Sequence, residues 1–155
     1  MKVSAGDVAP NFSLQDTSGN KVELYNRIRE GNKVLLLFFP LAFSSTCTEE
    51  LCTARDNMKL YNSLDTDVIG ISVDSFFTLN EFRKSQNLNF MLLSDFNRTV
   101  SEDYGVLYED FYGMEGVAKR SAFVVGEDKT VLFAEVLEDA SRLPDFDGIQ
   151  KALKG

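Results

Sequence analysis

The fold of this chain is decided by residues 33–52, which read Lys33-Val-Leu-Leu-Leu-Phe-Phe-Pro-Leu-Ala-Phe-Ser-Ser-Thr-Cys-Thr-Glu-Glu-Leu-Cys52. The first part is continuously apolar up to Phe39, as expected for a strand that is buried on both faces of a sheet. Pro40 ends the strand because it has no backbone N–H to donate. From about Ser45 the pattern becomes helical, since apolar residues recur at intervals of three or four. A strand that passes directly into a helix predicts an α/β sheet.

The remaining residues continue this alternation of strands and helices. Alternating apolar residues on both sides of a turn at 16–20 predict an N-terminal β-hairpin that covers the core. Further strands are expected at 67–73, 90–93, 121–125 and 130–135. Short helices are expected at 25–30, where Gly31 would close the helix, at 99–104 and at 147–153. The helix after Ser45 would bury Leu51, Ala54, Met58 and Tyr61. Another helix would follow a cap at Asp74 or Ser75. The last two strands form an antiparallel hairpin, so the central sheet is mixed.

Composition limits the possible classes of function. The chain has 155 residues, of which 44% are hydrophobic, and shows no repeat or flexible linker, so we expect one domain over residues 1–155. A net charge of -8 disfavours binding to nucleic acid. The N-terminus lacks the apolar core of a signal peptide, and the run 34–39 is far shorter than the about 20 residues that span a bilayer. We therefore expect a cytoplasmic protein without a membrane partner, where a cysteine pair is more often catalytic than structural.

The residue types that are missing narrow the chemistry further. The chain contains no His, which excludes Cys-His catalysis and His-ligated metal sites. It contains no Trp, so the Trp-Cys-x-x-Cys site of thioredoxins is absent. Two cysteines cannot supply the four ligands of a structural zinc ion. We therefore expect neither a metal nor a cofactor.

Cys47 lies in the expected first turn of the helix that follows Pro40. Unpaired backbone N–H groups and the positive end of the helix dipole favour a thiolate at this place. A free thiol has a pKa of about 8.5 and is mostly protonated at neutral pH, so it needs activation. Glu49 and Glu50 suit a helix start but oppose the thiolate, although Glu50 could instead pair with an arginine. A cation must therefore reach Cys47 from elsewhere in the chain, and the spacing does not identify it.

Several motifs resemble one family along essentially the whole chain. Pro40-x-x-x-Ser44-x-x-Cys47 resembles the active-site signature of the peroxiredoxins. Cys47-Thr-x-Glu-x-Cys52, followed by Arg55-Asp56, resembles the bacterioferritin-comigratory (PrxQ) branch. The opening Gly6-Asp-x-Ala-Pro-x-Phe-x-Leu14 and the late segment Lys119-Arg-Ser-Ala-Phe-Val-Val125 are also typical. The resemblance implies a thioredoxin-like fold and a thiol-dependent peroxidase.

The resemblance also implies a role for each residue of the signature. Cys47 would be the peroxidatic cysteine, whose thiolate attacks a peroxide and becomes sulfenic acid. Arg120 would favour this thiolate and bind a peroxide oxygen, although it could also be an ordinary salt-bridge partner at a strand edge. Ser44 stands where Thr is commoner; its hydroxyl would contact the peroxide or the thiolate, or would cap the helix. Pro40 would shield the site.

Cys52 would be the resolving cysteine, which forms an intrachain disulfide with Cys47. In an intact helix, five residues separate the two by about 7.5 Å of rise and about 140° of rotation. Disulfide Cα atoms lie within about 7 Å of each other, so the helix start must unwind before the bond forms. A thioredoxin-like dithiol would then reduce the disulfide. The alternative for Cys52 is simple packing in the helix core.

The favoured function is a peroxidase that reduces hydrogen peroxide and organic (alkyl) hydroperoxides at the expense of thioredoxin or a similar dithiol. The alternatives are a thioredoxin-like thiol-disulfide oxidoreductase and a redox sensor or copper(I) carrier without major peroxidase turnover. The five-residue separation of Cys47 and Cys52 disfavours the oxidoreductase, because thioredoxins use Cys-x-x-Cys. The sequence does not distinguish a monomer from a homodimer.

Overall fold

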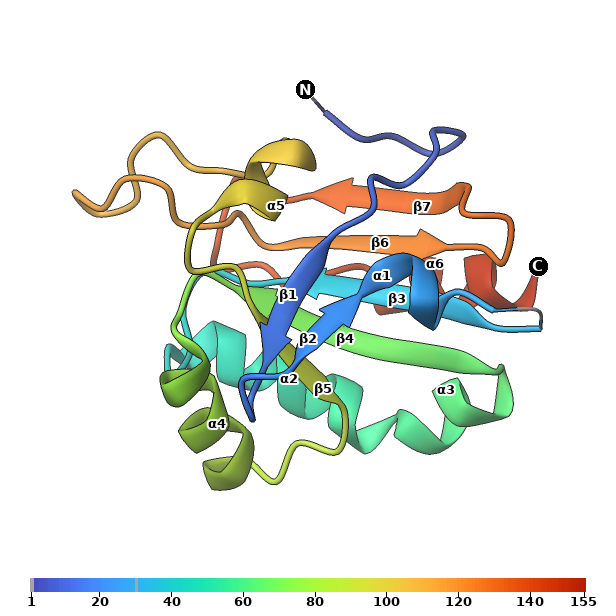
Figure 1. The fold of residues 1–155 in the computed structure, drawn as a ribbon, viewed down its shortest axis with the longest axis horizontal. Helices are drawn as coiled ribbons and strands as arrows, with labels where there is room; N and C mark the ends of the chain where they lie inside the picture. The colour runs from blue at the N-terminus through green and yellow to red at the C-terminus, as the bar shows by residue number, and fades with distance from the viewer. Residues whose placement is uncertain (1, 30) are drawn as a thin grey trace.

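A seven-stranded mixed sheet forms the centre of the protein in a computed structural model that describes residues 2–29 and 31–155 (Figure 1). The strand order is β2-β1-β5-β4-β3-β6-β7. The three parallel strands are β3 (Lys33–Phe38), β4 (Thr66–Ser72) and β5 (Met91–Ser94). The antiparallel strands are β1 (Ser13–Asp16), β2 (Lys21–Glu23), β6 (Ser121–Val125) and β7 (Val131–Val136). The predicted mixed sheet is therefore confirmed.

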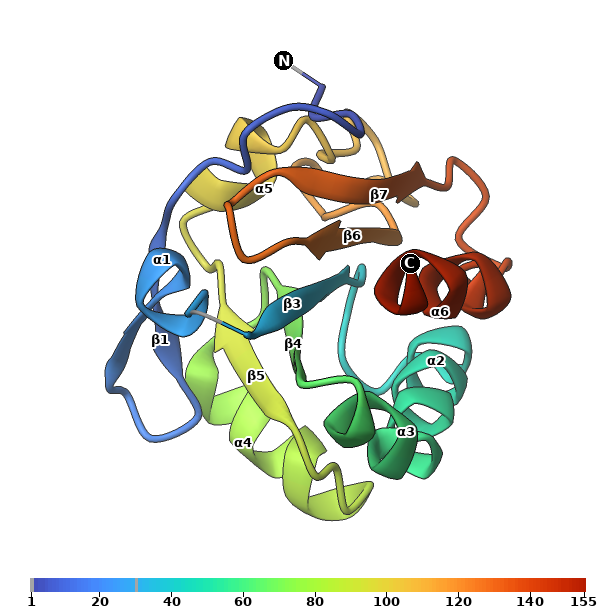
Figure 2. The same cartoon turned by 90° about the vertical axis from the view of Figure 1, so that its right-hand side faces the viewer.

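Helices cover both faces of the sheet (Figure 2). One face carries α2 (Ser45–Asp56), α3 (Met58–Ser63), α4 (Phe76–Ser85) and α6 (Phe146–Lys154). The other face carries α1 (Leu24–Arg27), α5 (Thr99–Asp103) and the N-terminal segment. In the described part of the chain, each helix is too short or too polar to cross a bilayer.

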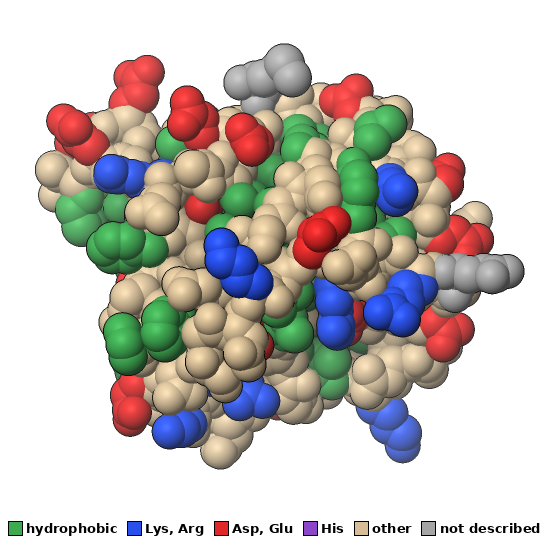
Figure 3. Space-filling view, viewed as in Figure 1, with side chains coloured by type: hydrophobic (Ala, Val, Ile, Leu, Met, Phe, Trp, Pro, Cys, Tyr) green, Lys and Arg blue, Asp and Glu red, His purple; other side chains and the backbone are tan. Residues whose placement is uncertain are grey.

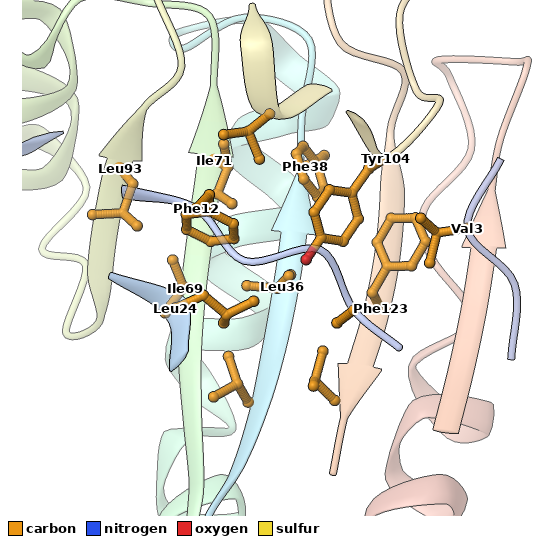
Figure 4. Packing of buried hydrophobic residues seen from close by; sticks show 14 of the residues in the cluster. Val3, Phe12, Leu24, Leu36, Phe38, Ile69, Ile71, Leu93, Tyr104 and Phe123 are labelled. Carbon is orange, nitrogen blue, oxygen red and sulfur yellow. The ribbon is translucent and has the colours of Figure 1, made fainter. Parts of the chain in front are cut away.

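The core consists of two apolar layers that β3 separates. Because side chains alternate along a strand, Leu35 and Leu37 face one layer while Leu36 and Phe38 face the other. Both sets are fully buried, which explains the continuous apolar run. In the layer that holds Phe38, its ring packs against Tyr104 and Phe123 (Figure 4).

Most predicted elements are confirmed with shifts of one or two residues, but three details differ. The N-terminal hairpin extends the sheet beside β5 in addition to covering the core. The helix predicted at 25–30 is the short α1, which ends at a C-cap at Ile28 instead of being closed by Gly31, and Glu30 lies outside the described residues. The helix after Ser45 divides at Asn57, whose side chain donates to the Thr53 carbonyl. The predicted stripe continues across this break, because its four residues are all buried.

Candidate active site

The register of the sheet brings the predicted site residues together. Phe38 at the end of β3 pairs with Ser121 at the start of β6, and the two strands are antiparallel. Arg120, which precedes Ser121, therefore lies beside the loop that follows Phe38 and leads into α2. In Figure 1 this end of the sheet lies on the left. A separation of 73 residues in the sequence thus becomes a direct contact between Arg120 and Cys47.

Cys47 is fully buried in the first turn of α2. The Arg120 guanidinium donates a hydrogen bond from Nη2 to Cys47 Sγ over 3.4 Å. The first N–H groups of a helix lack intrahelical acceptors, so Cys47 also lies at the positive end of the α2 dipole. This arrangement supplies the cation that the sequence requires near Cys47.

Arg120 is itself almost fully buried, and three groups hold its planar guanidinium. Nη1 donates to the Glu50 carboxylate, while Nη2 and Nε donate to the Ala140 carbonyl over 2.8 and 3.3 Å. Burial lowers the Arg120 pKa, but the charges of Glu50 and Cys47 raise it by more, so the guanidinium stays charged. Arg120 is therefore more than the ordinary salt-bridge partner of the alternative prediction. It forms a buried ion pair with Glu50 and also donates to the Cys47 sulfur.

Glu50 completes the buried cluster and changes the interpretation of the helix start. It follows Cys47 by three residues, which places both side chains on one face of α2. Its Oε1 accepts from Arg120, and its buried Oε2 has no hydrogen-bond partner among the described residues. Burial raises the pKa of Glu50 to about 7, although the charge of Arg120 and its hydrogen bond act in the opposite direction. Glu50 is therefore an arginine partner that is part-protonated near neutral pH, and it opposes the thiolate less than an exposed glutamate would.

The loop between β3 and α2 is held in a strained conformation. Phe43 has φ 71, a region that bulky residues rarely adopt. Asp74, beyond the carboxyl end of the neighbouring β4, accepts from the Ala42 N–H and from the Ser72 hydroxyl over 2.8 and 2.7 Å. Of the two predicted α4 caps, Ser75 is the residue whose hydroxyl accepts from the backbone. Asp74 instead fixes the active-site loop, a role that the sequence analysis missed.

Ser44 occupies the N-cap position of α2 without using its side chain as a cap. Its hydroxyl donates to the Leu41 carbonyl over 2.9 Å, within the loop. Its carbonyl accepts from both the N–H and the hydroxyl of Thr48. Ser44 is thus the N-cap residue, as one alternative predicted, but its hydroxyl does not cap the helix. Ser44 is exposed and borders the same pocket as Pro40.

A pocket of about 180 Å³ lies over this cluster. Its lining residues are Pro40, Ser44, Ser45, Thr46, Phe111, Tyr112, Arg120, Ala140 and Ser141. Cys47 is not part of the lining, but its sulfur contacts Arg120, which borders the pocket. Two larger hollows lie at the opposite end of the sheet beside Arg27 and Asp67, and neither is lined by a cysteine.

The aromatic wall of the pocket comes from the loop between α5 and β6. Phe111 stacks on Tyr108 at 4.9 Å and meets Tyr112 edge-on at 4.8 Å. Tyr108 is anchored through its hydroxyl, which donates to the Glu138 carbonyl. Tyr112 is 89% exposed, and hydrophobic side chains gather over this loop and α4 on the left of Figure 3. No site residue in this loop is predicted from the sequence.

Cys52 is separate from the buried cluster. It is half-buried on α2, and its thiol donates to Gln86 Oε1 over 3.6 Å. Both cysteines are free thiols on one continuous helix. The structure therefore brings Cys47, Arg120, Ser44 and Pro40 together and leaves Cys52 outside the group.

Comparison with known proteins agrees with this geometry. A model of the AhpC/TSA family matches residues 5–134. Peroxiredoxin Bcp of Escherichia coli (strain K12) is 40% identical over 129 residues, which are 81% of each chain. The chain belongs to the AhpC/TSA family. Its motifs and relatives place it in the Bcp (PrxQ) branch of the peroxiredoxins, a class of thiol-dependent peroxidases.

Solved peroxiredoxin structures confirm the thioredoxin-like fold. Peroxidoxin BcpB of Mycobacterium tuberculosis matches with a TM-score of 0.87 and 28% identity, over 98% of this chain and 97% of that one. The reduced 2-Cys peroxiredoxin of Plasmodium vivax matches with a TM-score of 0.86 and 24% identity, over 98% of this chain and 81% of that one.

Proposed function

We propose that this peroxiredoxin reduces hydrogen peroxide and organic hydroperoxides with Cys47 as the peroxidatic cysteine. One observation carries the proposal: a buried arginine that borders an open pocket donates directly to the Cys47 sulfur. An arginine in this position can stabilise the thiolate and then the charge that develops on a peroxide oxygen. We propose that residues 1–155 form one domain and that this domain carries out the whole reaction.

The first step needs only the thiolate and the peroxide. Cys47 sulfur attacks the terminal oxygen, an S–O bond forms and the O–O bond breaks. The leaving oxygen departs as hydroxide or alkoxide and takes a proton to become water or an alcohol. Cys47 is thereby oxidised to sulfenic acid. Arg120 would donate to the peroxide oxygens, Ser44 would orient the peroxide, and Pro40 would exclude water on one side of the sulfur.

The pocket supports both substrate classes. Its volume of about 180 Å³ accommodates hydrogen peroxide readily. Phe111 and Tyr112 add an apolar wall against which the organic part of a larger hydroperoxide can pack. Because Cys47 is fully buried, we expect the start of α2 to open slightly when a substrate enters.

Cys52 is proposed as the resolving cysteine in the same chain. The two thiols share one helix, so the disulfide requires α2 to unwind at one end. A thioredoxin-like dithiol would reduce this disulfide by thiol exchange. We propose a cytoplasmic location, where such reductants keep thiols reduced.

Rapid mixing of peroxide with the wild type and two variants tests the proposal. Cys47→Ser should abolish peroxide consumption, because it removes the nucleophile. Cys52→Ser should keep the first turnover, accumulate sulfenic acid on Cys47 and lose recycling by thioredoxin. Equal loss of the first turnover in both variants would contradict distinct peroxidatic and resolving roles, and wild-type consumption by Cys47→Ser would overturn the proposal.

A further inference from the structure

The second cysteine has a polar environment of its own at the end of α4. Gln86 is the C-cap residue of α4, and its side chain accepts from the Cys52 thiol. Arg55, which follows Cys52 by three residues on α2, donates from Nη1 to the backbone carbonyl of Gln86 over 2.5 Å. Gln86, at the end of α4, therefore contacts both Cys52 and Arg55.

The position of Arg55 suits a cation. The last carbonyls of a helix lack intrahelical partners and carry the negative end of the dipole. Arg55 provides one such carbonyl with a charged donor, and Asp56 pairs with its Nε. The Asp56 hydrogen bond, followed by the charge of Cys52, keeps the Arg55 pKa above its ordinary value. The guanidinium is therefore charged where it donates to the Gln86 carbonyl.

These contacts also divide α2 into two parts. Around Cys52, the helix is tied to α4 through Arg55, and Asn89 donates to the Arg55 carbonyl over 3.4 Å. Around Cys47, the first turn carries the exposed Ser45 and is tied to the rest of the protein through Arg120. Oxidation of Cys47 to a neutral sulfenic acid removes one of the two negative partners of Arg120, the other being Glu50, and so weakens this tie. The Cys47 end is therefore the end that can be released.

We propose that Arg55 is a positioning residue for the resolving step, on which it acts by holding the Cys52 half of α2 against the end of α4. This inference rests on the proposed function. In the step itself, Cys52 sulfur attacks the Cys47 sulfenic sulfur, an S–S bond forms and the S–O bond breaks. The oxygen leaves as hydroxide and takes up the proton that Cys52 released, so that one water is produced. No further oxidant or reductant is needed.

The test compares Arg55→Gln and Arg55→Lys with Arg83→Gln, which removes an exposed arginine from α4 as a charge control. Reduced protein is mixed with one equivalent of hydrogen peroxide and quenched at intervals with a dione that traps sulfenic acid. Mass spectrometry then gives the rates at which sulfenic acid forms and decays into the disulfide. We expect Arg55→Gln to form sulfenic acid at the wild-type rate and to resolve it roughly tenfold more slowly, because a charged contact is lost. Arg55→Lys should restore most of the rate, and Arg83→Gln should match the wild type.

Two further readouts separate the possible causes. Slow resolution gives excess peroxide time to react again, so Arg55→Gln should form more sulfinic acid than the wild type. Thermal unfolding of each variant shows whether a slow rate merely reflects a damaged fold. The inference is overturned if Arg55→Gln resolves at the wild-type rate, or if Arg55→Lys is as slow as Arg55→Gln. Failure of the proposed function looks different, because wild-type Cys47 would then form no sulfenic acid at all.

Discussion

The two halves of α2 carry the same functional group in opposite environments. Cys47 is fully buried, at a helix start, beside the buried pair Arg120 and Glu50. Cys52 is half-buried, in the middle of the helix, beside a partly exposed arginine. Under the proposed function, Cys47 reacts first, with little more than a slight opening of the helix start. Cys52 is held in place to react after the opposite end has unwound.

Removal of the Arg120 charge should have the largest effect on the difference between the two cysteines. We expect Arg120→Gln to lower the rate of the first turnover by about a thousandfold, as for the loss of a donor to a developing charge. Resolution of any sulfenic acid that forms should be affected much less. Stopped-flow peroxide consumption measures the first rate and trapping of sulfenic acid the second. A first turnover within threefold of the wild type would remove Arg120 from the chemistry.

Glu50 gives a second difference between the two halves of α2, because it should make the free energy of unfolding depend on pH. Its pKa is raised in the folded protein to about 7, so the folded state holds a proton that the unfolded state releases at lower pH. The stability from this group is complete below pH of about 4.5 and is lost as the pH rises to about 7. Relative to Glu50→Gln, the wild type should therefore lose on the order of 2 kcal/mol between pH 5 and pH 8. Urea unfolding of both proteins at several pH values measures this loss.

One outcome of the Glu50 experiment would contradict the prediction. A difference in unfolding free energy between wild type and Glu50→Gln that stays constant from pH 5 to pH 8 would contradict the raised pKa. Asp56 is a mostly exposed carboxylate that pairs with Arg55 in the other half of α2. Asp56→Asn is therefore the matched control for the Cys52 end.

Ser45 gives the smallest effect and sharpens the comparison at the helix start. Ser45 is exposed at the first helical position, and Ser44 before it has φ -74 and ψ 149, a conformation that a following proline accepts. Ser45→Pro should stabilise the folded start and slow resolution about twofold, because proline suits this position. Ser45→Gly should speed resolution by about the same factor. Equal resolution rates in both variants would show that the start of α2 does not open in the rate-limiting step.

The sequence predicted those parts of the site that depend on local order. Pro40 follows a strand and Cys47 lies in the first turn of a helix, and both follow from hydrophobic pattern and backbone chemistry within a few residues. Arg120 came from the family resemblance, because no local signal shows that residue 120 reaches residue 47. The structure supplies the reason, which is the antiparallel register of β3 and β6.

Other parts depend on contacts between distant segments and could not be predicted. The Ala140 carbonyl accepts from Arg120, and Asp74 accepts from Ala42, across strands that only the folded sheet brings together. Phe111 and Tyr112 lie in a loop whose pattern showed only turns. Glu50 carried a usable signal, since it follows Cys47 by three residues on one helix face, but only burial explains its raised pKa.

Amide hydrogen exchange of the reduced and the peroxide-oxidised protein tests the unequal roles of the two helix ends most directly. In the reduced protein, both halves of α2 should be protected as parts of one helix. After one equivalent of peroxide, we expect residues 45–51 to lose protection while residues 53–63 keep it, with a disulfide between Cys47 and Cys52. An oxidised protein in which residues 45–51 stay protected, or in which residues 53–56 open instead, would contradict this account.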